Sequence, residues 1–291
     1  GTCKDRDILR YNPHALLEGM LIASYAIGAE VAYCYLRGEF IDDVYLSVKK
    51  ALKDAYKNKL IGKNILDSNV CIEIHDLIGA GAYIVGEETA MLESIEGKKG
   101  FPRYKPPFPA VKGLFGCPTI INNVETLASV PEIINKGSEW FNKIGTDKSS
   151  GFKCFSVSGH VNKPGNYEIP LGTPFKDLLE LAGGVKNNKK LKAVIPGGSS
   201  VPVVPGEKML ETNMDYESIS NAGSMLGSGA VIIMDEDTNM VEVIHRIARF
   251  YYSESCGQCT PCREGTGWMY KIIDKIIKGQ ATIEDFESLK S

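Results

Sequence analysis

Three cysteines near the C-terminal end carry the spacing of a metal-binding motif. Cys256, Cys259 and Cys262 stand three residues apart within the segment 253–267. A turn that brings the first two thiols together also presents the third, and Gly257 lets the backbone curl around an inorganic core without a Cβ clash. The spacing predicts a site for a metal ion or a metal cluster.

Three kinds of site compete for these thiols. A disulfide framework would leave one of the three unpaired. Zinc usually takes its four ligands from two separated pairs, and no second pair of cysteines occurs in the sequence. An iron–sulfur cluster fits the spacing best. The fourth ligand that such a cluster needs is missing, because no cysteine follows Cys262 and the nearest one before the motif is Cys154.

The residues after the second cysteine of the motif predict a helix. Thr260 is a good N-cap and Pro261 a good first helical residue, which places Cys262 in the first turn. The positive end of the helix dipole then favours the thiolate form of that cysteine.

Length, charge and composition narrow the class of protein. With 291 residues and 43% hydrophobic content, the chain predicts two or three domains. A net charge of −3 gives no reason to expect nucleic acid or an acidic membrane as a partner. We find no apolar run long enough to span a bilayer and no signal peptide, and the five other cysteines are scattered singly, which favours a reducing cytoplasm. The chain opens without Met and closes inside a segment that begins like a capped helix, so we expect a piece of a longer polypeptide.

The first part of the chain alternates between helix and strand patterns. Segments 12–28 and 43–60 predict helices, the first of them apolar almost all round, and segments 31–36 and 70–75 predict strands. Such alternation is typical of α/β layers.

A glycine-rich turn follows these elements. Residues 79–86 hold three glycines after a strand, and Glu87 and Glu88 open the next helix. Such a turn lets a flat or phosphorylated ligand lie against backbone N–H groups. The spacing is not that of the dinucleotide motif Gly-x-Gly-x-x-Gly, and a tight structural turn with helix-start charges explains these residues equally well.

The next loop could also contact a nucleotide. Residues 101–110 contain four prolines and three aromatic residues, so they predict a stiff loop that exposes Lys105 and Phe108. A cation and an aromatic face on a rigid loop suit a nucleotide, although a rigid connector packed by its prolines is the alternative. Asn122 or Asn123 then caps another helix, whose free N–H groups could hold a phosphate.

Four motifs in this order resemble a known family. They are Gly-Ala-Gly-Ala-Tyr-Ile-x-Gly-Glu-Glu-Thr-Ala, Pro-Arg-x-Lys-Pro-Pro-Phe-Pro, Asn-Asn-Val-Glu-Thr-Leu and Glu-Ser-Cys-Gly-x-Cys-Thr-Pro-Cys-Arg-Glu-Gly. Together they look like the NADH-binding flavoprotein subunit of respiratory complex I and its relatives in NAD-linked hydrogenases and formate dehydrogenases. The resemblance covers essentially the whole chain.

The resemblance implies a role for each motif. It implies that the FMN site is lined by Gly86, Glu87, Glu88, Asn122, Asn123 and Thr126. It implies that NADH is faced by Glu88, Lys105 and Phe108. Glu88 would be the residue of the catalytic site that positions the nicotinamide, and Phe108 would stack on a ring. Cys256, Cys259 and Cys262 would hold a 4Fe–4S cluster.

The resemblance also implies an activity and partners. NADH would give a hydride to FMN, and single electrons would pass to the 4Fe–4S cluster. The expected partners are NADH and other iron–sulfur subunits, namely a thioredoxin-like 2Fe–2S subunit and a ferredoxin-domain subunit, in a cytoplasmic or peripheral complex that reduces quinone. The alternatives are the diaphorase subunit of a hydrogenase or formate dehydrogenase, a non-catalytic iron–sulfur scaffold, and a Rossmann dehydrogenase with structural zinc.

Three domains are expected. Residues 1–145 would form a Rossmann-like α/β domain for FMN and NADH, and the polar segment after residue 145 is the predicted boundary. Residues 152–236 predict short strands and one capped helix, as in a ubiquitin-like β-grasp domain. Residues 239–291 predict a helical iron–sulfur domain. The family's first FMN loop would lie before residue 1 and its fourth cluster cysteine beyond residue 291.

Overall fold

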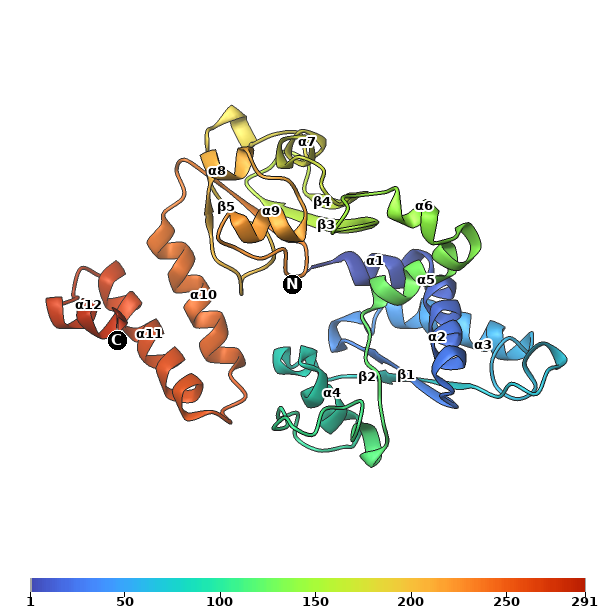
Figure 1. The fold of residues 1–291 in the computed structure, drawn as a ribbon. Coiled ribbons are helices and arrows are strands. Elements are labelled where there is room, and N and C mark those ends of the chain that lie inside the picture. The colour runs from blue at the N-terminus through green and yellow to red at the C-terminus, as the bar shows by residue number, and fades with distance from the viewer. Residues whose placement is uncertain (1, 291) are drawn as a thin grey trace. The chain divides into compact units, whose positions relative to one another are not determined.

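The computed structural model describes residues 2–290 (Figure 1). Its elements group into two compact units. Unit 1 runs up to Cys34 and then takes in Phe40–Asp76 and Asn123–Thr238. Unit 2 consists of Tyr35–Glu39, Leu77–Asn122 and the residues from Asn239 onward. Both contain residues that are distant in sequence, so each unit is held together by tertiary packing rather than by chain continuity.

Helices make up much of the first half of unit 1. They are α1 (Lys4–Tyr11), α2 (Pro13–Ile27), α3 (Val44–Lys57), α5 (Val124–Lys136) and α6 (Ser138–Asn142). Strands β1 (Val31–Leu36) and β2 (Glu73–Ile78) pair in a two-stranded sheet. The predicted alternation of helix and strand is confirmed.

Helix α2 begins and ends where the sequence predicts. The Asn12 side chain accepts a hydrogen bond from the Ala15 N–H at 3.4 Å, and Gly28 ends the helix in the left-handed region at φ 70°. A Cβ at Gly19 would lie 1.9 Å from the Leu127 carbonyl oxygen, so this glycine lets the backbones of α2 and α5 approach closely. The helix is apolar almost all round, as the sequence shows, but it is not buried all round, because Tyr25 at its C-terminal end is 68% exposed.

Strand β2 begins three residues later than predicted. Ile72 instead exchanges two backbone hydrogen bonds with Gly62, at 2.8 and 2.9 Å, in an isolated bridge. The ladder with β1 therefore starts only at Glu73. An alternating pattern locates a strand but does not say which partner each of its residues will pair with.

The second half of unit 1 is a five-stranded mixed sheet in the order β4-β3-β7-β5-β6. Its strands are β3 (Phe152–Gly159), β4 (Gly165–Pro170), β5 (Leu191–Ile195), β6 (Val204–Pro205) and β7 (Ala230–Asp235). Strand β3 is antiparallel to β4 and parallel to β7, with Phe155 opposite Tyr167 and Val157 opposite Val231.

Helices cover this sheet and close its core. They are α7 (Phe175–Leu181), α8 (Gly206–Leu210) and α9 (Tyr216–Asn221), so two short helices join the single one predicted. Phe155, Phe175 and Leu178 are fully buried in one hydrophobic cluster. The predicted helix is α7, but no side chain caps it: Pro174 is its N-cap residue, and the Thr173 hydroxyl before it donates to the Pro170 carbonyl at 2.7 Å.

Unit 2 contains the remaining helices. They are α4 (Glu88–Ile95), α10 (Met240–Glu254), α11 (Thr260–Ile277) and α12 (Ile283–Lys290). Helices α10 and α11 pack together and bury Ala248 and Ile273. His245 Nε2 of α10 lies 3.2 Å from Asp274 Oδ1 of α11, so this histidine lies where the two helices meet. No helix within residues 2–290 is long and apolar enough to cross a bilayer.

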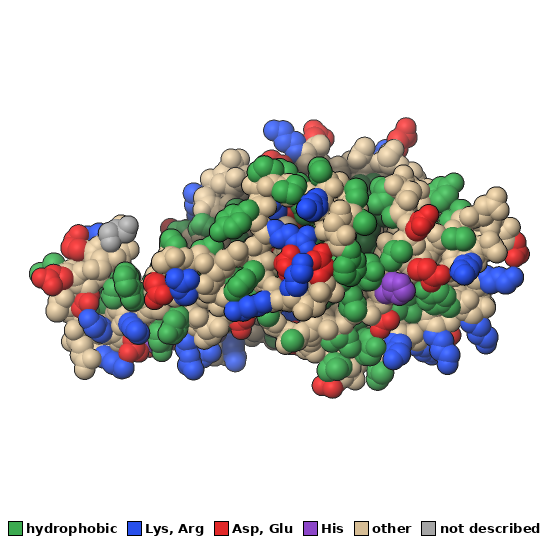
Figure 2. All heavy atoms as spheres, turned by 90° about the horizontal axis from the view of Figure 1, so that it is seen from below, with side chains coloured by type: hydrophobic (Ala, Val, Ile, Leu, Met, Phe, Trp, Pro, Cys, Tyr) green, Lys and Arg blue, Asp and Glu red, His purple; other side chains and the backbone are tan. Residues whose placement is uncertain are grey.

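Surface charges of both signs are mixed. On the face drawn in Figure 2, Lys and Arg side chains alternate with Asp and Glu side chains and with hydrophobic ones. This mixture agrees with the small net charge of −3.

Candidate functional site

The glycine-rich turn leaves open space where a ligand is expected. It passes through a 3₁₀ turn, Tyr83–Gly86, directly before α4. Gly86 is exposed, its φ lies outside the left-handed region, and a Cβ built on it meets no atom within 4 Å. Neither backbone strain nor packing within the described residues demands a glycine here. The missing side chain instead leaves room for a flat group to lie against the backbone.

The two glutamates after this turn have different roles. Glu87 caps α4, since its Oε2 accepts hydrogen bonds from the Ala90 N–H at 2.9 Å and from the Thr89 hydroxyl at 2.6 Å. Glu88 is the first residue of the helix, and its carboxylate pairs with the Lys105 ammonium. The structure thus brings Glu87, Glu88 and Lys105 together, with Lys105 Nζ 3.4 Å from Glu87 Oε1.

These contacts favour the ionised forms of Glu87 and Lys105. Burial opposes ionisation of Glu87, but the hydrogen bonds from Thr89, Ala90 and Lys105 hold its pKa below the usual value. The hydrogen bond to Glu88 raises the pKa of Lys105. Glu87 and Lys105 are therefore charged at neutral pH, and side-chain exposures of 43% for Glu88 and 30% for Lys105 leave both Glu88 and Lys105 accessible to a solute.

The proline-rich segment presents an aromatic ring to solvent. Phe108 is 58% exposed, while its carbonyl oxygen accepts hydrogen bonds from the N–H groups of Val111 and Lys112 at 2.9 and 3.0 Å. Pro109 next to it is buried. The backbone is thus anchored and the ring is left available, as the sequence predicts.

The Asn-Asn pair divides between the two units. Asn122 is exposed at the end of a segment of unit 2, whereas Asn123 caps α5 in unit 1. The Asn123 Oδ1 accepts from the Glu125 N–H at 3.0 Å and from Lys4 at 2.8 Å, and its Nδ2 donates to Asp5 at 3.0 Å. The side chain of Asn123 is therefore engaged within the protein.

At the start of α5, the groups that could bind an anion are mainly backbone N–H groups. Thr126 is exposed in the first turn of the helix. N–H groups in this turn carry the positive end of the helix dipole. The predicted roles of Asn122, Asn123 and Thr126 toward FMN stay predictions.

The cysteine motif lies where α11 begins. The N-cap is Cys259, and Thr260 is already helical, so the predicted cap at Thr260 was wrong. The Thr260 hydroxyl accepts only a weak hydrogen bond from the Arg263 guanidinium, at 3.4 Å, and no side chain caps the helix. The prediction that Cys262 lies in the first turn is confirmed.

The chemistry of this loop fits an iron–sulfur group. Cys259 and Cys262 are exposed and Cys256 is partly exposed, next to Gly257 in the left-handed region at φ 79°. Arg263 Nη1 braces the turn by donating to the Gly257 carbonyl at 2.8 Å. Among residues 2–290 no group of three or more His, Cys, Asp or Glu side chains is arranged around a common metal position. The three thiols supply the donor set of a cluster, and their assignment as ligands stays a prediction.

Contacts within unit 2 join this loop to the nucleotide segments. Gln258 Nε2 donates to the Pro102 carbonyl at 3.0 Å, and the Tyr83 N–H donates to Glu254 at 3.1 Å. Tyr83 also packs edge-on against Phe250, with ring centroids 5.1 Å apart. No local pattern in the sequence points to these contacts, because each joins residues more than 150 positions apart.

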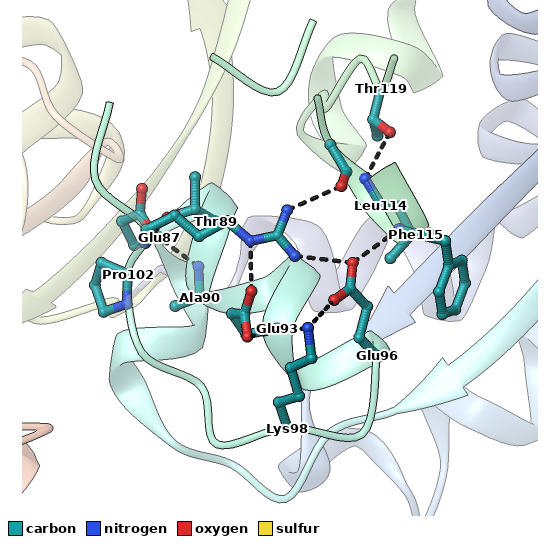
Figure 3. A network of polar contacts seen from close by, with 12 residues as sticks. Glu87, Thr89, Ala90, Glu93, Glu96, Lys98, Pro102, Leu114, Phe115 and Thr119 are labelled. Atoms are coloured by element: carbon teal, nitrogen blue, oxygen red, sulfur yellow. Dashed lines mark hydrogen bonds and ion pairs between the residues drawn. The ribbon is translucent and has the colours of Figure 1, made fainter. Parts of the chain in front are cut away.

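A second set of contacts that sequence reasoning missed surrounds Arg103 (Figure 3). We call it the Arg103 network, and it consists of the side chains of Glu93, Glu96, Lys98 and Arg103 with the backbone groups that they contact. Within it Glu96 accepts from Lys98 at 2.7 Å, from Arg103 at 2.8 Å and from the Phe115 N–H at 2.8 Å.

Glu96 gives the network a pH dependence. Hydrogen bonding to Lys98, and then to Arg103 and Phe115, outweighs burial and lowers the pKa of Glu96 from 4.5 to about 2. A carboxylate whose pKa falls on folding stabilises the fold above pH 4.5, and that contribution is lost as the pH falls toward 2. We therefore expect the Phe115 amide to exchange its hydrogen faster, relative to its intrinsic rate, as the pH falls through this window. In a Glu96→Gln variant the relative rate should not change there, and an equally steep rise in the variant would contradict the assignment.

Comparisons with known proteins decide the family. Residues 1–132 match the Nuo51 FMN-binding domain, residues 154–204 the SLBB domain, and residues 242–291 the NADH-ubiquinone oxidoreductase-F iron-sulfur binding region. The F subunit of the NADH-quinone oxidoreductase of Rickettsia bellii (strain OSU 85-389) is 54% identical over 99% of this chain and 70% of its own length. Its counterpart in Rickettsia akari (strain Hartford) is 53% identical. The chain belongs to the family of these F subunits.

A solved structure supports the same fold. The crystal structure of an NAD+-reducing NiFe hydrogenase in its H2-reduced state matches with a TM-score of 0.86 and 36% identity over 100% of this chain. The chain described here spans 48%, about half, of the length of that hydrogenase chain. These comparisons confirm three predictions for the chain described here. They are the α/β fold class, the resemblance to the flavoprotein subunits, and FMN and a 4Fe–4S cluster as cofactors.

Proposed function

We propose that this chain is the NADH-oxidising subunit of a multisubunit NADH:quinone oxidoreductase. When bound, FMN supplies the hydride acceptor and the 4Fe–4S cluster supplies a one-electron exit. The observation that carries the proposal is the charged group of Glu87, Glu88 and Lys105 beside the open space at Gly86. Family membership adds a matching FMN-binding domain and iron–sulfur region.

The chain's own residues bind and orient the nucleotide in this proposal. Lys105 offers a fixed cation to the phosphates, Glu88 orients the nicotinamide, and the exposed Phe108 ring stacks on a planar group. Hydride transfer needs a short, aligned approach and no proton from a side chain, so orientation is the main contribution of these residues.

A second candidate is the diaphorase subunit of a hydrogenase. The match to the NAD+-reducing hydrogenase favours it, since the two chains share the fold at 36% identity. Both candidates oxidise or reduce the nicotinamide at the same site and differ in the subunits that take the electrons. We propose partners of the iron–sulfur type, a thioredoxin-like 2Fe–2S subunit and a ferredoxin-domain subunit, in a complex at the cytoplasmic face of a membrane.

The test is FMN-dependent reduction of ferricyanide by NADH in the isolated protein. We expect activity only after reconstitution with FMN. NADH oxidation that is absent with bound FMN, or that proceeds equally without it, would exclude the proposed function. The cluster-only scaffold would then be the better account.

Gly86→Ala gives a specific test of the flavin site. The free energy of unfolding of the variant should equal that of the wild type or exceed it by up to about 1 kcal/mol. Alanine restricts the conformations of the unfolded chain, and its Cβ meets no atom in the fold. The Cβ should nevertheless cost FMN roughly 1–3 kcal/mol of binding free energy, which fluorescence titration with FMN measures. Gly165→Ala is the matched control, since that glycine also has a negative φ and room for a Cβ but lies in β4. Equal FMN affinity in both variants would contradict the assignment of Gly86.

A further inference from the structure

Arg103 uses all three nitrogens of its guanidinium in contacts within unit 2. Its Nε donates to Glu93, its Nη2 to Glu96 at 2.8 Å, and its Nη1 to the Gly113 carbonyl at 2.9 Å (Figure 3). Its backbone N–H donates to the Thr89 hydroxyl at 2.8 Å. The guanidinium is thus held flat between two carboxylates and a carbonyl, a fork geometry that only arginine provides.

The contact to Gly113 closes a loop. Residues 103–113 follow α4 in the chain, and the guanidinium of the first residue of this segment donates to the carbonyl oxygen of the last. Glu96 secures the far end as well, because it accepts from the Phe115 N–H at 2.8 Å. Lys105 and Phe108 lie inside this closed segment.

A relay ties the same arginine to the charged group at the start of α4. Thr89 is 1% exposed. Its hydroxyl accepts a hydrogen bond from the Arg103 N–H and donates one to the Glu87 carboxylate at 2.6 Å. Glu87 in turn lies 3.4 Å from Lys105 Nζ. The backbone at Arg103 is therefore placed relative to the carboxylate that Lys105 contacts two residues later.

We propose that Arg103 is a positioning residue for NADH, which acts by clasping the segment 103–113 and so holding Lys105 and Phe108 in place. This inference rests on the proposed function. The guanidinium itself is committed to Glu93, Glu96 and Gly113, so it acts through the loop and does not contact the nucleotide. A preorganised loop binds its ligand without first losing conformational entropy, and that gain is lost when the clasp is opened.

The test compares Arg103→Lys and Arg103→Gln with Lys98→Ala in the FMN-loaded holoenzyme. Lysine keeps the charge but cannot serve three acceptors in one plane. We expect KM for NADH to rise about tenfold or more in both arginine variants, with kcat changed less than about twofold, because the loss affects binding of substrate and transition state alike. Lys98→Ala removes the contacts of Lys98 to Glu96 at 2.7 Å and to Glu93 at 3.8 Å, keeps all three guanidinium contacts of Arg103, and should leave KM unchanged.

A second measurement needs no activity. Amide hydrogen exchange over residues 104–112 should quicken in Arg103→Lys and stay unchanged in Lys98→Ala. Unchanged exchange in Arg103→Lys would overturn the clasp, and so would faster exchange with an unchanged KM or a loss confined to kcat. If the wild-type holoenzyme fails to oxidise NADH, the proposed function fails, and the exchange data alone then decide whether Arg103 closes the loop. Arg103→Lys decides these outcomes if the glutamine variant does not fold.

Discussion

Cys259→Ala is expected to remove the iron–sulfur cluster while NADH still reduces ferricyanide through the flavin. Cys259 is the middle thiol of three in one loop, and it is the N-cap residue directly before α11. Thiolates are the ligands that hold iron in such clusters, and alanine offers no substitute. The expected loss is close to complete, with iron and sulfide content falling to roughly a tenth of the wild-type value or less.

Iron and sulfide analysis together with the visible spectrum measures this loss. Cys71→Ala is the control, because Cys71 is also exposed but lies in unit 1, outside the three-cysteine motif. It should keep both the iron content and the activity. A Cys259→Ala variant with a full complement of iron, or a zinc ion in place of iron in the wild type, would show that the three cysteines serve another purpose.

Lys105→Ala is expected to raise KM for NADH about ten- to hundredfold. The substitution removes a cation and leaves the carboxylates of Glu87 and Glu88 facing an anionic dinucleotide. The effect should thus exceed that of losing one contact. Because the pKa of Lys105 is raised, its charge persists throughout the neutral and mildly alkaline range, and KM should not change from this group across it.

A double variant separates attraction from repulsion. Adding Glu88→Gln to Lys105→Ala removes one negative charge and should recover part of the lost affinity, as measured by KM. Lys112→Ala is the matched control, since it removes a positive charge from an exposed position of the same part of the chain. If Lys112→Ala raises KM as much as Lys105→Ala does, the effect comes from net charge and the assignment of Lys105 is wrong.

Local signals in the sequence were sufficient for the elements that carry the site. Asn12, Pro13 and Gly28 mark the bounds of α2, and the cysteine spacing with Pro261 places Cys262 in the first turn of α11. Such signals depend on residues within one or two turns of each other, so the sequence contains all the information that they need.

The contacts that position the site needed the three-dimensional structure. The sequence predicts Asn123 as a helix cap, but it does not show that Lys4 and Asp5, more than 100 residues away, also contact the side chain of Asn123. The Arg103 network likewise depends on the tertiary packing of the proline-rich segment against α4. A motif shows which residues are neighbours in sequence. Only the three-dimensional structure shows which of their polar atoms already have hydrogen-bond partners within the protein.

An anaerobic titration of the holoenzyme with NADH tests the central claim most directly. The visible flavin band and the electron paramagnetic resonance signal of the reduced cluster are followed together. We expect NADH to bleach the flavin band and to produce the cluster signal in the wild type, and to bleach the flavin band alone in Cys259→Ala. If NADH leaves the flavin band unchanged in a wild-type protein that holds both cofactors, this chain does not oxidise NADH.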